Sequence, residues 1–334
     1  HDAGRIASDA GRLEPEPLDV RSAAHGDQDL VAGDPSRGAV SLDNEDPLVA
    51  AVARLYADAG LPFDLYSIDK PADWPLRRKD VRDRAARLDP GLRRIVAQAV
   101  LDLADALRWH RIAFRNVDGR AMLAASTRRD MTATQLDGME DYPELDEIAR
   151  TLDEDALVTS SRKTVDAAAR LESALEAWAK ATKADLRAQS FDLVTPAGRI
   201  VVAGSGDDVH DERDVLLLVD LGGNDRYTGT AGAGTITQPV SVLVDLAGDD
   251  TYVAEDPRQA AQGSGILGTG VLVDVAGNDR YRAVGSSQGY GLFGTGVLAD
   301  LAGDDLYELD NEGQGAAEFG VGLLVGWLIG RERR

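Results

Sequence analysis

The period of the hydrophobic pattern changes near residue 190. Between Asp46 and about residue 190, apolar residues recur at spacings of three and four, which is typical of amphipathic helices. After about residue 191, apolar runs shorten to four or five residues and glycine becomes frequent. The pattern predicts a multidomain α+β chain, with a flexible arm over 1–45, an α-helical bundle over 46–190 and a β-structured domain over 191–334.

Two of the predicted helices begin at an Asp-Pro pair. Asp46 and Asp89 each precede a proline, and this order supplies both a capping side chain and a residue suited to the first helical turn. The first of these helices is expected to end at Gly60. A short apolar segment over 145–152 and a long one near 162–187 complete the predicted bundle.

One phrase occurs four times in the C-terminal region, as VDLGGNDRY, VDLAGDDTY, VDVAGNDRY and ADLAGDDLY. Its first aspartate stands at positions 220, 245, 274 and 300, and Gly326 takes this place in a fifth copy. A Gln-Gly pair recurs at 262–263, 288–289 and 314–315, always 12 residues before that position. A period of about 26 residues with short β-type runs predicts a parallel β-helix (β-solenoid) with one coil per repeat. Antiparallel hairpins are the weaker alternative, because all copies run in the same direction.

Alternation along each strand divides the apolar residues between two faces. We assign the residues one before and one after the repeated aspartate, such as Val219 and Leu221, to the coil interior. The aspartate would then point outward together with a column of five leucines, namely Leu218, Leu243, Leu272, Leu298 and Leu324. Such a stripe should not face water. We therefore expect the helical bundle to cover it, and an oligomer formed through the leucine column is the alternative.

The turn Gly-(Asn/Asp)-Asp-x-Tyr stacks acidic side chains on one another. Neighbouring coils lie about 4.8 Å apart, and each adjacent pair of like charges then costs on the order of 3 kcal/mol at an effective dielectric constant of about 20. A bound cation or protonation would relieve this repulsion. Oxygen ligands without cysteine favour a hard cation, Ca²⁺ before Mg²⁺. The candidate metal ligands are Asp220, Asp225, Asp245, Asp249, Asp250, Asp274, Asp279, Asp300, Asp304 and Asp305. A ladder of purely structural Asp/Asn turns is the alternative.

The turn Gly223-Asn224-Asp225-Arg226-Tyr227 and its copies resemble the second half of the glycine- and aspartate-rich nonapeptide of calcium-binding, RTX-type β-roll proteins. The resemblance is limited to the turn motif, because the repeat in this chain is about 26 residues long instead of nine. It implies that aspartate carboxylates and turn carbonyls hold Ca²⁺ and that the protein is secreted.

Composition narrows the range of partners. The formal net charge of −22 and the absence of cysteine argue against nucleic acid, an anionic membrane surface, disulfides and thiolate metal sites. No apolar run approaches the roughly 20 residues that span a bilayer. The sequence begins at His1 instead of Met, which favours a processed protein that is secreted, periplasmic or at the cell surface.

These observations favour a calcium-stabilised structural or surface-binding module whose partner is a glycan or a cell-surface component. A carbohydrate-active enzyme, either a polysaccharide lyase or a glycoside hydrolase, is the alternative, because such enzymes are found on parallel β-helices. Its candidate catalytic residues are Asp207, Asp208, His210 and Arg280. His110 lies on the apolar face of a predicted helix and is interpreted as a core residue.

Overall fold

The computed structural model describes residues 46–61, 78–128, 143–311 and 313–326, all within one compact unit, Asn44–Arg334. The predicted arm over 1–45 lies outside the described residues. The helices are α1 (Pro47–Asp58), α2 (Arg78–Ala85), α3 (Pro90–Phe114), α4 (Gly119–Arg128), α6 (Pro143–Thr151) and α7 (Glu154–Ala181), followed by a short 3₁₀ helix, Leu186–Ala188.

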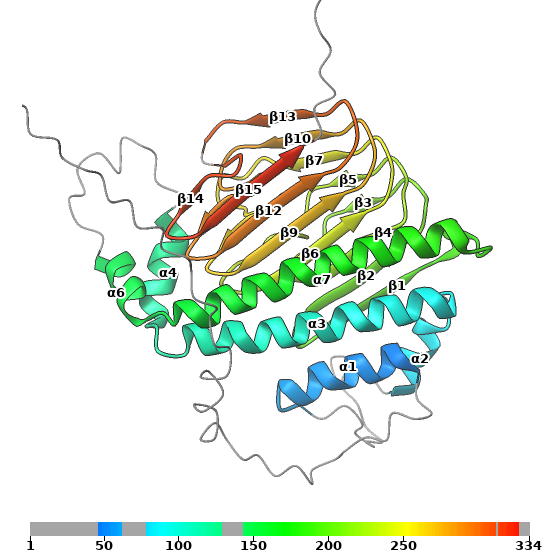
Figure 1. The fold of residues 1–334 in the computed structure, drawn as a ribbon, viewed down its shortest axis with the longest axis horizontal. Coiled ribbons are helices and arrows are strands. Elements are labelled where there is room, and N and C mark those ends of the chain that lie inside the picture. The colour runs from blue at the N-terminus through cyan, green and yellow to red at the C-terminus, as the bar shows by residue number, and fades with distance from the viewer. Residues whose placement is uncertain (1–45, 62–77, 129–142, 312, 327–334) are drawn as a thin grey trace, which may run out of the picture. The chain divides into compact units, whose positions relative to one another are not determined.

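Parallel strands form the C-terminal part, and the predicted β-solenoid is confirmed (Figure 1). The seven-stranded sheet contains, in spatial order, β1 (Phe191–Thr195), β2 (Gly198–Ala203), β4 (Val215–Asp220), β6 (Val240–Asp245), β9 (Thr269–Asp274), β12 (Thr295–Asp300) and β15 (Val321–Gly326). The five-stranded sheet contains β13 (Leu306–Leu309), β10 (Arg280–Ala283), β7 (Thr251–Ala254), β5 (Arg226–Tyr227) and β3 (Val209–His210). The three-stranded sheet contains β14 (Ala317–Glu318), β11 (Gly291–Leu292) and β8 (Gly265–Ile266).

The register of the strands is the one that the repeat predicts. Asp245 pairs with both Asp220 and Asp274, and Tyr281 pairs with Tyr252 in the five-stranded sheet. The coils are numbered here by their strand in the seven-stranded sheet, from the first (β4) through β6, β9 and β12 to the fifth (β15). Among the described strands, only β1 runs antiparallel to its neighbour, β2, and it forms the edge of the seven-stranded sheet beside the first coils.

The two predicted Asp-Pro helix starts are confirmed. Oδ1 of Asp46 accepts a hydrogen bond from the amide of Leu48 at 3.0 Å, and Oδ1 of Asp89 accepts one from the amide of Gly91 at 2.8 Å. These bonds satisfy amides that have no partner within the first turn of a helix. Helix α7 begins at Glu154, eight residues before the expected start at residue 162, because Asp153 caps it there. Helices α2 and α4 were not predicted.

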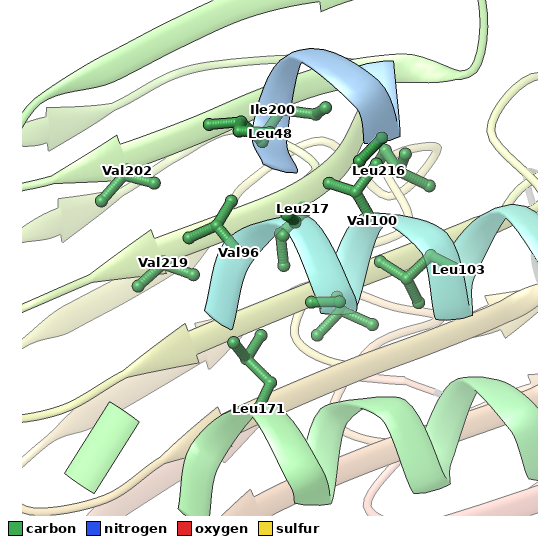
Figure 2. Packing of buried hydrophobic residues seen from close by; sticks show 14 of the residues in the cluster. Leu48, Val96, Val100, Leu103, Leu171, Ile200, Val202, Leu216, Leu217 and Val219 are labelled. Carbon is green, nitrogen blue, oxygen red and sulfur yellow. The ribbon is translucent and has the colours of Figure 1, made fainter. Parts of the chain in front are cut away.

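Helices α1, α3 and α7 lie side by side as one layer over the seven-stranded sheet (Figure 1). Their apolar faces and the strands share one hydrophobic core, in which Val96, Val100 and Leu171 meet Leu217 and Val219 (Figure 2). The helical region and the solenoid therefore bury each other's apolar surface.

The predicted inside and outside of the coil are reversed. Leu218, Leu243, Leu272 and Leu298 are buried inside the coil against a stack of tyrosines, while Val219 and Val244 face the helices. The repeated aspartate shares the parity of the leucine, so it also points inward. The prediction that the helical bundle covers the leucine column was wrong, although these four leucines are buried. Since parallel strands covered on both faces are apolar throughout, alternation separates the two faces without showing which is inside.

The helical layer covers the first coils better than the last. Helix α7 packs on β6 and β9, and the helix-facing valines Val242 and Val271 are buried. On β15 the equivalent positions are open, with Val321, Leu323 and Val325 exposed by 57%, 46% and 44%. The solenoid therefore depends less on helix packing toward its C-terminal coils.

If the leucine column forms the coil interior, Leu272→Ala should leave a cavity that the stacked coils cannot close. We expect a loss of about 3 kcal/mol in the free energy of unfolding, measured by urea denaturation. The matched control is Val194→Ala on β1, whose side chain is 68% exposed and whose loss should cost less than about 0.5 kcal/mol. Equal effects of the two substitutions would contradict the assigned interior.

Candidate metal centre

The candidate site runs along one corner of the coil, where each strand of the seven-stranded sheet turns into the five-stranded sheet. Three columns of side chains follow this corner through successive coils. The inner aspartate column consists of Asp220, Asp245, Asp274 and Asp300. The turn aspartate column consists of Asp208, Asp225, Asp250, Asp279 and Asp305. The outer column consists of Asp207, Asn224, Asp249, Asn278 and Asp304.

The inner aspartate column is held by tyrosine hydroxyls. Tyr252 donates to Oδ2 of Asp274 at 2.7 Å, and Tyr307 donates to Oδ2 of Asp300 at 2.7 Å. Tyr227 donates to Asp245 in the same way. All four aspartates of this column are fully buried. A carboxyl group in such a position is stable only with partners for its oxygens.

The predicted tyrosine column is confirmed, and it places these hydroxyls. The rings of Tyr227 and Tyr252 stack with centroids 4.5 Å apart, those of Tyr252 and Tyr281 at 4.6 Å, and those of Tyr281 and Tyr307 at 4.8 Å. The planes are almost parallel, because each ring repeats the position of the one in the coil before. One hydroxyl per coil thus reaches the inner aspartate column.

The predicted glutamine column is also confirmed. Nε2 of Gln262 donates to the carbonyl of Arg282 in the next coil at 2.9 Å, and Nε2 of Gln288 donates to that of Glu308 at 3.0 Å. Both side chains are buried. The interior polar groups therefore join adjacent coils as the strands do.

The turn aspartate column forms a hydrogen-bonded ladder. Oδ1 of Asp250 accepts from the amide of Asp225 at 2.6 Å, and Oδ1 of Asp279 accepts from the amide of Asp250 at 2.7 Å. The glycine directly before the Asn/Asp-Asp pair of each turn permits this approach. A Cβ at Gly248 would overlap the carbonyl oxygen of Gly223 in the coil before. Glycine is needed at this position for close contact, and of the four turn glycines at this position only Gly223 has positive φ.

The outer column makes the same type of ladder but alternates carboxylate and amide. The amide of Asn278 donates to Oδ1 of Asp249 at 2.9 Å, and the amide of Asp304 donates to Oδ1 of Asn278 at 3.1 Å. These side chains are exposed. The alternation keeps carboxylates apart in this column, whereas the turn aspartate column has carboxylates in adjacent coils.

His210 stands where the tyrosine column begins. Its ring stacks on Tyr227 with centroids 4.8 Å apart, and its Nε2 lies 2.8 Å from Oδ2 of Asp220. Burial lowers the pKa of His210, but hydrogen bonds to Asp220 and Glu212 outweigh this effect and raise it to about 10. The first coil thus holds its own cationic partner for the inner aspartate column.

The two inward-facing columns come together in groups of three carboxylates that could hold a metal ion. The groups are Asp220 with Asp225 and Asp245, Asp245 with Asp250 and Asp274, and Asp279 with Asp300 and Asp305; a fourth group joins Asp208 and His210 to Asp220. Several carboxylate oxygens in them are buried without a hydrogen-bond partner, namely Oδ2 of Asp225, Asp250 and Asp279 and Oδ1 of Asp274 and Asp300. These unsatisfied oxygens point to a ligand or to protons.

Burial changes the acidity of these groups. Burial raises the pKa of Asp225 to about 7, and burial with the nearby charge of Asp274 raises the pKa of Asp279 to about 9. Burial likewise raises the pKa of Asp250 and Asp274 above the ordinary carboxyl value. Without a cation, Asp279 therefore holds a proton at neutral pH, and Asp225 and Asp274, whose pKa values are raised to about 7, are partly protonated.

The remaining predicted site residues lie apart from these groups. Asp249 and Asp304 belong to the exposed outer column, as does Asp207. Arg280 forms an ion pair with Glu308 at 2.9 Å. It stands on β10, three strands from His210 on β3, a distance of about 14 Å at the usual strand spacing. The four candidate catalytic residues are therefore not gathered in one place.

Two contributors to the site were not assigned from the sequence. The tyrosine hydroxyls were recognised as a column without their role as donors, and His210 was named as a candidate catalytic residue instead of a partner of Asp220. The signal for His210 was present, because it occupies the tyrosine position of a degenerate repeat. His110 is buried, with Nε2 2.8 Å from the carbonyl of Leu267, as its core interpretation requires.

The chain matches no known family, no curated protein and no solved structure. None of the described helices is long and apolar enough to cross a membrane.

The raised carboxyl pKa values predict how the cation-free protein responds to pH. A carboxyl group whose pKa is higher in the folded state stabilises the fold below its unfolded value, near 4, and this stability is lost as pH rises through the folded value. In the presence of EDTA, the free energy of unfolding should therefore fall between about pH 5 and about pH 8. The slope should approach about 1.4 kcal/mol per pH unit for each proton released.

Urea denaturation at several pH values measures this slope. Asp225→Asn removes one titrating group and should make the slope shallower, whereas Asp249→Asn in the exposed outer column should leave it unchanged. A stability that rises with pH over this range would refute the assignment of buried protons.

Proposed function

We propose that the chain is an exported, calcium-stabilised β-solenoid that serves as a structural or surface-binding module. The observation that carries this proposal is the set of buried carboxylate oxygens without hydrogen-bond partners in the two inward-facing columns. An unsatisfied buried polar atom costs about 1–3 kcal/mol, and more when it is charged. The cost recurs in successive coils, so a ligand that removes it would stabilise the whole stack.

The outer column indicates that the ladder alone does not require aspartate. Asn224 accepts the amide hydrogen bond of Asp249 at 2.8 Å, just as an aspartate would. Asparagine in the turn aspartate column could accept the same bond through its single carbonyl oxygen without any like-charge repulsion. That column nevertheless contains only aspartate, and Oδ2 is the unpartnered oxygen in Asp225, Asp250 and Asp279. The second oxygen therefore has a role other than the ladder hydrogen bond, and in this proposal that role is to bind a cation.

The donor set favours calcium over magnesium. Carboxylates, tyrosine hydroxyls and turn carbonyls are all oxygen ligands, and the chain has no cysteine. Ca²⁺ accepts six to eight oxygen ligands in irregular geometry, whereas Mg²⁺ requires near-octahedral geometry and usually retains several waters. The inner aspartate column is fully buried and leaves little room for such waters.

Export and binding are proposed from two features of the sequence. The turns resemble those of a secreted calcium-binding family, and the acidic composition suits an environment rich in calcium. A glycan or cell-surface component is the partner that we propose for such a module. We do not propose a carbohydrate-active enzyme, because Arg280 lies three strands from His210 and is paired with Glu308, away from Asp208 and His210.

If calcium binding contributes to folding free energy, EDTA should lower the melting temperature and Ca²⁺ should restore it more fully than Mg²⁺. Differential scanning calorimetry of the full chain measures this shift. The double variant Asp250→Asn with Asp279→Asn should retain the ladder hydrogen bonds but lose most of the response to calcium.

The matched control is Asp249→Asn with Asp304→Asn in the outer column, which should respond to calcium as the unmodified chain does. A melting temperature that EDTA does not change, together with a more stable Asp250→Asn/Asp279→Asn variant, would mean that the turns are held by hydrogen bonds alone.

A further inference from the structure

The inner aspartates of the first two coils are fully occupied by protein groups. Oδ1 of Asp220 accepts from the amide of Gly222 at 3.0 Å, and Oδ2 lies 2.8 Å from Nε2 of His210. In the second coil, Asp245 is satisfied in the same manner by the amide of Ala247 at 3.0 Å and by the Tyr227 hydroxyl. The group Asp220, Asp225 and Asp245 thus has one unpartnered oxygen, Oδ2 of Asp225.

The later coils lack these internal partners. Asp274 and Asp300 each receive tyrosine hydroxyls on Oδ2, but their Oδ1 atoms are buried and unpartnered. Each shares its group with a turn aspartate whose Oδ2 is also unpartnered, Asp250 in one group and Asp279 in the other. Two groups therefore offer two free oxygens each, Asp245 with Asp250 and Asp274, and Asp279 with Asp300 and Asp305.

These two groups follow the first coil and lead up to the fifth, which is the coil that the helical layer covers least. They connect the second coil to the third and the third to the fourth. Along the same direction the helix-facing residues change from buried at Val242 and Val271 to exposed at Val321 and Leu323. Packing against α3 and α7 thus supports the second and third coils, whereas the fifth coil lacks this cover and depends on the coil before it.

We propose that two divalent cations bind, one in each of these two groups, and that they order the C-terminal coils, while the His210 ring occupies Oδ2 of Asp220 in the first coil. This inference rests on the proposed calcium binding and adds where the cations bind and which part of the fold depends on them. Removal of the cations should disorder the solenoid beginning at its C-terminal coils, while the first coil stays folded.

Two measurements on the full chain with CaCl₂ test the inference. Isothermal titration calorimetry should give about two calcium ions per chain, about one for Asp274→Asn and about one for Asp300→Asn. Asp220→Asn, the matched change in the first coil, should still bind about two. Hydrogen–deuterium exchange of the unmodified chain should show that EDTA abolishes amide protection in β12 and β15 but leaves β4 protected.

The outcomes separate this inference from the proposed function. If calcium neither binds nor alters exchange in any coil, both fail. If calcium binds but EDTA loosens β4 as much as β12, or if Asp220→Asn loses one ion, calcium stabilisation stands and the assignment to the later coils is overturned. Because the exchange pattern is measured on the unmodified chain, a variant that does not fold leaves this test intact.

Discussion

The stacking of each residue on its equivalent in the next coil is the constraint on which the rest of the structure depends. Coils repeat at the spacing of hydrogen-bonded strands, so like side chains meet all along the solenoid. For tyrosine this is favourable, because rings 4.5–4.8 Å apart stack face on face. For glutamine it supplies a partner in the adjacent coil. For aspartate this stacking destabilises the fold through like-charge repulsion, so every acidic column needs an interaction that neutralises the charges or keeps them apart.

The molecule uses a different device in each column. The outer column alternates asparagine with aspartate, and solvent screens the remaining charge. The inner aspartate column receives tyrosine hydroxyls and, at its first member, His210. The turn aspartate column has an amide hydrogen bond for one oxygen only, as at Oδ1 of Asp250. Both inward-facing columns thus retain carboxylate oxygens without a hydrogen-bond partner, and for this reason they form the candidate metal centre.

Much of the fold could be predicted from periodicity, but the direction of the side chains could not. The 26-residue register follows from identical phrases, and the helix starts at Asp46 and Asp89 follow from local capping chemistry. Which face of the strands lies inside the coil depends on which face the helices cover. Tertiary packing decides this, and the local sequence cannot reveal it where neighbours such as Leu218 and Val219 are both apolar and both buried. Likewise, the columns of acidic residues were visible in the sequence, whereas the saturation of Asp220 by His210 requires two residues ten positions apart to meet inside the coil.

The two ends of the described solenoid share the parallel strand pairing but differ in the interactions that support them from outside the stack. At the first coils, antiparallel β1 covers the edge of the seven-stranded sheet, the helical layer buries its outer face and His210 begins both the aromatic stack and the pairing of Asp220. At β15 the equivalent valines and leucine are exposed, and Gly326 replaces the inner aspartate. In a repeat fold each coil is stabilised mainly by its neighbours, so local stability should fall along the stack as outside support is lost. A ligand in the later coils would then change how many coils are ordered, without changing the fold of the coils.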